Sequence, residues 1–185
     1  NFPEYPYPRY AGGSLSGKSL LLHAEQGLGD SIHFIRYAQL AKNAGAHVLF
    51  HCPPALCKLF GHLPFIDQII PMPSAPPTCD FYLPLMSAPH IFQTRPETIP
   101  RDTPYITPDP KLIEQWKHWL SQQPGRLKVG IVWQGNPDHP ADWQRSLPFR
   151  VLNGLAHPDV TFIPLQLVHG GEQLTDETAL HIADP

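Results

Sequence analysis

The chain has 185 residues, of which 42% are apolar, so it can bury the core of one domain with chain to spare. A net charge of −3 gives no electrostatic basis for binding nucleic acid or an anionic membrane. The three cysteines lack C-x-x-C spacing, and no apolar run approaches the ~20 residues that span a bilayer. We therefore expect a cytoplasmic protein without a membrane span, a disulfide framework or a metal site.

Residues 1–17 are rich in proline and aromatic side chains and predict an extended lead-in segment. At its end, the run from Gly12 to Ser19 matches the phosphate-loop pattern G-x-x-x-x-G-K-S letter for letter. A phosphate loop needs a strand before its glycines and a helix after its lysine. Here a proline-rich coil precedes the pattern and a strand-like run follows it, so a plain turn into a strand is favoured over a nucleotide-binding loop.

The next stretch joins an apolar run, residues 20–23, to two glycines and an acid, Gly27-Leu28-Gly29-Asp30. Apolar side chains then recur at helical spacing, which predicts a strand, a tight turn and a helix over about 30–44. This is the opening of a Rossmann-like sheet, and its turn places Glu25 and Asp30 where open α/β sheets bind ligands. The third glycine of a dinucleotide fingerprint is replaced by Ile32, which argues against NAD and leaves no predicted cofactor.

The rest of the first domain alternates strands with helices and loops. We expect strands over 46–51, 67–70 and 79–85, a short helix that Pro53 and Pro54 open and that runs through Phe60, and a longer amphipathic helix over 111–122. This order is typical of a parallel sheet with right-handed crossovers, and predicts a three-layer α/β sandwich.

After Gln123-Pro124-Gly125 the pattern restarts. A strand over 127–133 leads into the turn Gln134-Gly135-Asn136-Pro137, followed by a polar loop, a helix over 148–156 and a strand over 160–165. The expected organisation is a lead-in at 1–17, a Rossmann-like domain at 18–125, and the first β-α-β part of a second such domain at 126–185.

Several motifs resemble one family of proteins. They are residues 23–37 (HAEQGLGDSIHFIRY), 84–89 (PLMSAP), 98–105, and 132–137 (VWQGNP) with Arg145-Ser146. In unbroken order, these motifs resemble bacterial tetratricopeptide-repeat proteins whose C-terminal region is similar to the heptosyltransferases. The resemblance implies a GT-B architecture, in which an acceptor domain and a donor domain, both Rossmann-like, face a cleft.

The resemblance also implies a function and partners. It implies that the chain is part of a sugar-nucleotide-dependent glycosyltransferase, which transfers a sugar to a hydroxyl of a glycan or protein acceptor. It places repeats before residue 1 and the remaining donor half after residue 185. Because such a site needs both halves, we expect the 185-residue chain alone to transfer no sugar. The alternative is a non-catalytic GT-B-like module that binds a partner beside the repeats.

Within this resemblance, Gly29-Asp30 falls on the Gly-Asp pair whose acid is the family's proposed general base. The other reading of Asp30 is a helix N-cap, and the sequence leaves both open. Glu25, Gln26 and His23 match the repeat-protein group. The candidate substrate contacts at this turn are Glu25, Gln26, Gly27 and Gly29. Candidate donor contacts are Trp133, Gly135, Asn136 and Arg145, for which a rigid turn with a solvated arginine is the alternative.

Overall fold

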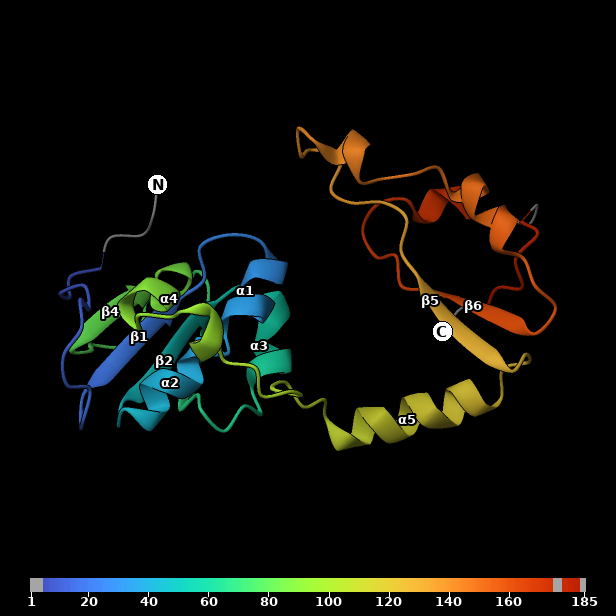
Figure 1. Cartoon of the computed structure of the whole chain (residues 1–185). Helices are drawn as coiled ribbons and strands as arrows, with labels where there is room; N and C mark the ends of the chain where they lie inside the picture. The colour runs from blue at the N-terminus through green and yellow to red at the C-terminus, as the bar shows by residue number, and fades with distance from the viewer. Residues whose placement is uncertain (1–4, 175–177, 184–185) are drawn as a thin grey trace. The chain divides into compact units, whose positions relative to one another are not determined.

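The structure is a computed structural model that describes residues 5–174 and 178–183 (Figure 1). The chain forms two compact units, Asn1–Asp109 and Pro110–Pro185, which are described separately below. The division lies before helix α5 (Pro110–Ser121), whereas the boundary expected from the sequence lies after it.

The first unit is built on a four-stranded parallel sheet, as the sequence predicts. Its strands are β1 (Ser19–His23), β2 (His47–Cys52), β3 (Gln68–Pro71) and β4 (Phe81–Pro84). They lie in the order β3-β2-β1-β4, so β1 has a parallel neighbour on each edge. Its three leucines are fully buried, which explains the unbroken apolar run in the sequence.

The helix expected over 30–44 is two helices. Helix α1 (Leu28–Phe34) begins two residues earlier than predicted, and α2 (Tyr37–Asn43) continues after a break at Ile35 and Arg36. At the break, Arg36 Nε donates to the carbonyl of His33 at 2.8 Å. The remaining helical elements of this unit are α3 (Pro54–Phe60), α4 (Ala88–Ile91) and the 3-10 turns η1 (Leu85–Ser87) and η2 (Pro96–Thr98).

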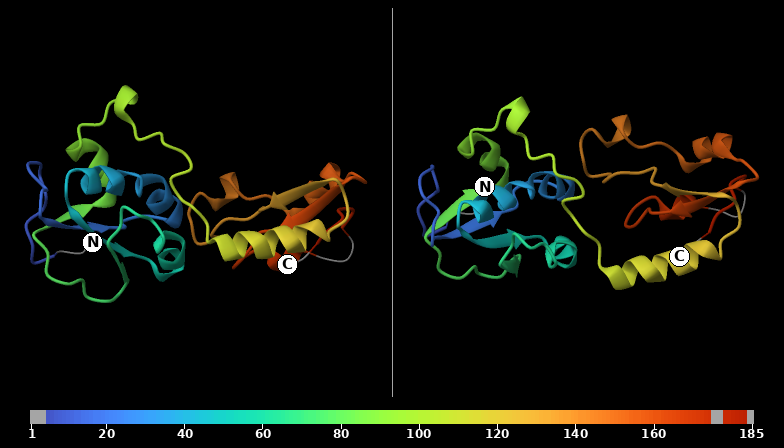
Figure 2. Two further views of the ribbon diagram at one scale, coloured as in Figure 1. Left: turned by 90° about the horizontal axis from the view of Figure 1, so that it is seen from below. Right: turned by 60° about the horizontal axis from the view of Figure 1, so that its bottom comes forward.

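The two faces of this sheet are covered differently. Alternate strand residues, including Leu20, Leu22 and Phe50, pack with Ile35 and Phe60 of the helical layer. The opposite face carries Leu21, Leu49 and Ile70, and the described side chains packed against that cluster are tyrosines, two of them from the lead-in segment. In a three-layer sandwich, helices would cover this face as well. In the described part of this unit, tyrosines of the lead-in and of β4 cover it instead, so the predicted third layer was wrong. Figure 2 shows the unit from two further sides.

The lead-in segment is fastened to the free edge of β4. Tyr10 N donates to the carbonyl of Tyr82 at 2.8 Å, and Tyr82 N donates to the carbonyl of Pro8 at 3.1 Å. Within the same segment, the hydroxyl of Tyr5 lies 2.9 Å from Nδ1 of His51 in β2. Burial lowers the pKa of the neighbouring His23 to about 4, so this histidine is neutral in the folded protein at pH 7.

The phosphate-loop pattern is a turn, as its context predicts. Strand β1, not a helix, follows Lys18, whose ammonium pairs with the Asp80 carboxylate at 3.1 Å. The other Asp80 oxygen accepts from the amide and the hydroxyl of Ser19, both at 2.8 Å. This carboxylate therefore ties the start of β1 to the start of β4.

The second unit contains a smaller parallel sheet of β5 (Leu127–Ile131) and β6 (Val160–Pro164). Its core consists of Ile131, Trp133, Phe149, Phe162 and Leu180. The other elements are α5 and the 3-10 helices η3 (Asp142–Gln144), η4 (Phe149–Leu155) and η5 (Gly171–Gln173). None of the helices in the described part of the chain is long and apolar enough to span a membrane.

Replacing Asp80 by asparagine should make the thermal stability of the fold less dependent on pH in the acidic range. The Ser19 amide and hydroxyl and the Lys18 ammonium lower the pKa of Asp80 from 3.8 to about 2, so its charge stabilises the fold above pH 4 and ceases to do so as the pH falls towards 2. Thermal unfolding should show a lower Tm for Asp80→Asn at pH 7 and a difference from wild type that shrinks between pH 4 and pH 2. The exposed loop variant Glu97→Gln is the control, and an Asp80→Asn difference independent of pH would contradict the assignment.

Candidate functional site

The strand order places a topological switch point at the carboxyl end of β1. The chain leaves β1 towards β2, while β4 lies on the other edge, so the order reverses between β1 and β4. Open α/β sheets bind their ligands at such a switch point, outside the carboxyl ends of the strands. The two segments that meet here are the turn that follows His23 and the turn η1 that follows β4.

A hydrogen bond from Glu25 joins these two segments. Its Oε2 accepts from the backbone amide of Met86 at 2.9 Å. Glu25 is half-buried, and its other oxygen makes no hydrogen bond with the described residues. The contact thus fixes the spacing between the two turns at the switch point.

Asp30 lies at the first turn of α1 but is not its N-cap. The N-cap is Gly27, and Asp30 is the third helical residue, whose Oδ2 accepts from the Gly27 amide at 3.0 Å. This is the acidic half of a capping box, so the cap interpretation is corrected in position although its stabilising effect on the helix start remains. Within the described part of the chain, Oδ1 of Asp30 forms no hydrogen bond or ion pair.

The rest of this turn is open. Gln26, Gly27 and Gly29 are exposed, and a Cβ added at Gly29 would meet nothing within 4 Å. The first amides of a helix have no intrahelical acceptor, so they can bind an oxygen atom of a ligand. Among the described residues, Gln26, Gly27 and Gly29 thus lie exposed on the same turn as Asp30.

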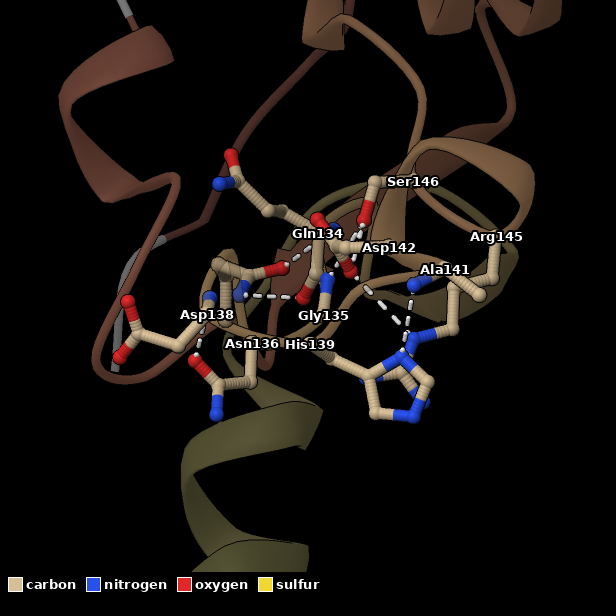
Figure 3. Close-up of polar contacts among 10 residues, drawn as sticks. Gln134, Gly135, Asn136, Asp138, His139, Ala141, Asp142, Arg145 and Ser146 are labelled. Carbon is tan, nitrogen blue, oxygen red and sulfur yellow. Dashed lines mark hydrogen bonds and ion pairs between the residues drawn. The ribbon is translucent and has the colours of Figure 1, made fainter.

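In the second unit, a polar network surrounds Gly135 (Figure 3). The Gly135 amide donates to the Ser146 hydroxyl, which donates to Asp142 Oδ1, both at 2.8 Å. Arg145 Nε lies 3.3 Å from the same oxygen. A Cβ at Gly135 would come within 2.5 Å of this oxygen and 2.9 Å of Arg145 Nε, so only glycine fits without displacing the ion pair.

The other predicted donor contacts have different surroundings. Trp133 is a core residue with 2% exposure, and its indole nitrogen donates to the carbonyl of Gly170 at 3.0 Å. Trp133 thus anchors the start of the loop that contains Gly135 to the core. Asn136 is exposed, and its side chain accepts from the amide of Asp138 at 3.0 Å (Figure 3). Of the four residues predicted here, Gly135 and Arg145 belong to one polar network. Trp133 packs in the core before the loop, and Asn136 is exposed on the loop itself.

A cavity of about 390 Å³ lies at the carboxyl ends of β5 and β6. Gln166 joins the two loops that border it, because its Oε1 accepts from the amides of Trp133 and Gln134, both at 3.0 Å. The rim carries exposed apolar side chains, among them Leu167 and Val168. No lysine or arginine is among the described residues that line this cavity.

Sequence reasoning gave no site role to Met86, Asp142, Ser146 or Gln166, although Met86 and Ser146 lie within the motifs described above. Met86 contributes only a backbone amide, so its side chain carries no signal. Asp142 and Ser146 lie on either side of Arg145 at i,i+4 spacing, which in a polar loop is not distinctive. Gln166 is the second residue after β6 and is the one residue that the rule of strand carboxyl ends could have found.

The chain was compared with known proteins. No protein-family model matches it. It is 23% identical to the protein FlbA of Caulobacter vibrioides over 182 residues, covering 88% of this chain but only 30% of that protein. It is also similar to a crystal structure of a glycosyl transferase family 9 protein from Veillonella parvula, with a TM-score of 0.60, 12% identity, and coverage of 93% of this chain and 70% of the other. The predicted Rossmann-like fold of GT-B type is confirmed, and these values show the fold alone.

Replacing Gly135 by alanine should disrupt the network in Figure 3. The added methyl group must displace Asp142 Oδ1 or Arg145, which we expect to cost about 1–3 kcal/mol of unfolding free energy, as for other overpacked sites. Urea unfolding of Gly135→Ala measures this cost.

Gly154→Ala is the matched control, because a Cβ at Gly154 meets nothing within 4 Å. It should change stability by less than about 1 kcal/mol in either direction. Equal effects of the two variants would show that the crowding at Gly135 is relieved without breaking the ion pair.

Proposed function

We propose that the chain is part of a glycosyltransferase that transfers a sugar from a sugar nucleotide to a hydroxyl group, with Asp30 as the general base. The transfer needs a base within reach of the acceptor hydroxyl and groups that stabilise the departing diphosphate. The first unit would hold the acceptor and the second the donor. The nucleotide sugar is a substrate here, so the proposal includes no cofactor.

The observation that carries this proposal is the bonding of the Asp30 carboxylate. One oxygen accepts from the Gly27 amide and the other has no partner among the described residues, so the side chain is held in position and still has an atom that can accept a proton. Its place at the β1–β4 switch point and the likeness of the fold to a glycosyl transferase support the same role.

On the donor side, Arg145 is the candidate phosphate contact. Its side chain is about half exposed, and within the described residues it bonds Asp142 through Nε alone, so its terminal nitrogens could bind a second anion. Gly135 and Asn136 would shape the loop next to it. The chain spans about 30% of the length of FlbA. We therefore propose the complete donor site for the whole protein and not for this chain alone.

A second candidate is a binding module without catalysis, placed next to tetratricopeptide repeats in the whole protein. The observation that favours it is the lining of the cavity at β5 and β6. That lining is largely apolar and includes no lysine or arginine among the described residues, whereas a diphosphate is better held by positive charge. In this case Asp30 would only stabilise the start of α1.

The two candidates are separated by Asp30→Asn in the complete gene product. An asparagine oxygen can still accept from the Gly27 amide but cannot take a proton, so Tm should stay near wild type. If Asp30 is the base, sugar transfer should fall by roughly 10²–10⁴-fold, the usual contribution of general acid–base catalysis.

Asp30→Ala removes both properties and should also lower Tm, which serves as the control for the structural role. Its cost should be on the order of 1 kcal/mol, as for other helix-start contacts. Wild-type turnover in Asp30→Asn would remove the catalytic role.

A further inference from the structure

Another cavity, of about 220 Å³, lies in the first unit, and the two turns of the switch point contribute no residue to its lining. Its walls come from three segments: the start of α2, the loop before β3, and the loop that follows η2. The lining residues are Arg36, Gln39, Pro64, Phe65, Pro100, Asp102, Pro104, Tyr105 and Thr107. Sites for drug-sized ligands measure about 300–1,000 Å³, so this cavity fits one small ring and not a whole nucleotide.

The wall formed by residues 100–107 is fastened to the helices. Arg36 Nη1 donates to the carbonyl of Pro100 at 3.0 Å and Nη2 donates to the Tyr105 hydroxyl at 3.2 Å. That hydroxyl in turn donates to the carbonyl of Ile32 at 3.0 Å. The guanidinium also lies over the Tyr105 ring, 4.5 Å from its centre. The cavity is therefore a preformed feature with a fixed wall.

These contacts also decide which charge the cavity can receive. Each of the three side-chain nitrogens of Arg36 donates one hydrogen bond within the protein, because Nε donates to the carbonyl of His33 in addition to the two bonds above. These three partners are neutral and leave its positive charge in place, but Asp102 brings a negative charge to the same lining. The lining therefore has no net charge and favours neither an anionic nor a cationic ligand.

The remaining polar groups are mainly hydrogen-bond acceptors. Asp102 and Thr107 are exposed, and their side chains form no hydrogen bond within the described part of the chain. Gln39 donates its amide nitrogen to Asn43 at 2.7 Å, which leaves its carbonyl oxygen for a ligand. The floor is apolar, because Phe65 is 4% exposed and the prolines carry no donor. A neutral ring with several hydroxyl donors matches this lining.

We infer that this cavity binds one neutral sugar residue of the acceptor. The inference rests on the proposed function, since it assigns the acceptor to the glycan class. Asp30 lies in α1 and Arg36 at the start of α2, the next helix of the same unit. A sugar held beside Arg36 would be part of the same acceptor as the hydroxyl at Asp30, but would not be the reacting residue. The cavity would thus select the acceptor without taking part in the chemistry.

The test is an NMR titration of the ¹⁵N-labelled chain with methyl glycosides of glucose, galactose, mannose, N-acetylglucosamine and rhamnose. At least one glycoside should shift the amide signals of Gln39, Asp102 and Thr107 with a millimolar dissociation constant. Asp102→Ala should weaken this binding by about tenfold or more, as expected for the loss of hydrogen bonds to a charged group. Thr107→Val should weaken it by a smaller factor. Glu97→Gln, an exposed carboxylate of the same region outside the cavity, should leave it unchanged.

The inference is overturned if no glycoside shifts these signals, or if Asp102→Ala and Thr107→Val leave the shifts unchanged. It is also overturned if a proline-rich peptide shifts them and no glycoside does, since the cavity would then serve a protein partner. Sugar transfer by the complete gene product separates this inference from the proposed function. Transfer that Asp102→Ala does not affect, without glycoside binding in the cavity, removes the inference alone. Glycoside binding in the cavity without any transfer supports the inference and removes the proposed function.

Discussion

Strand β1 is paired in parallel on both edges and buried on both faces, and the position of every other element of the first unit follows from this. A strand in this position can end only at the edge of the sheet where its neighbours also end. The turn after β1 must therefore meet the turn after β4, and the Glu25 carboxylate joins them through the Met86 amide. The free oxygen of Asp30 lies at this junction because α1 starts here, and its other oxygen is bound to that start.

The parts predictable from the sequence are those in which local pattern and tertiary structure agree. The leucines of β1 form an apolar run because both faces of the strand are buried, and all four strands of the first sheet were found in this way. The two strands of the second sheet and the turn around Gly135 were found for the same reason. Asp30 lies in the first turn of α1, as predicted, but it is the third helical residue and Gly27 is the N-cap.

The rest depends on contacts between distant residues. A lead-in without periodicity gives no sign that its tyrosines will cover a sheet face, because that face is completed only when Tyr5 lies against His51. The break between α1 and α2 falls inside a continuous apolar period and coincides with the side chain of Arg36, which bonds a loop 64 residues further on. The cavity at residues 100–107 follows from the same side chain. Backbone groups such as the Met86 amide can be used by any residue, so no sequence pattern identifies them.

The most direct measurement is the release of nucleoside diphosphate by the complete gene product, supplied with a panel of sugar nucleotides and with glycan acceptors. We predict that one sugar nucleotide is consumed, that the diphosphate is released in proportion to the added acceptor, and that the acceptor gains the mass of one sugar. Both the proposed base at the β1–β4 junction and the proposed acceptor cavity require this dependence on acceptor. Consumption of no sugar nucleotide, under conditions where the folded protein binds the same glycans, would contradict glycosyl transfer and identify a binding module.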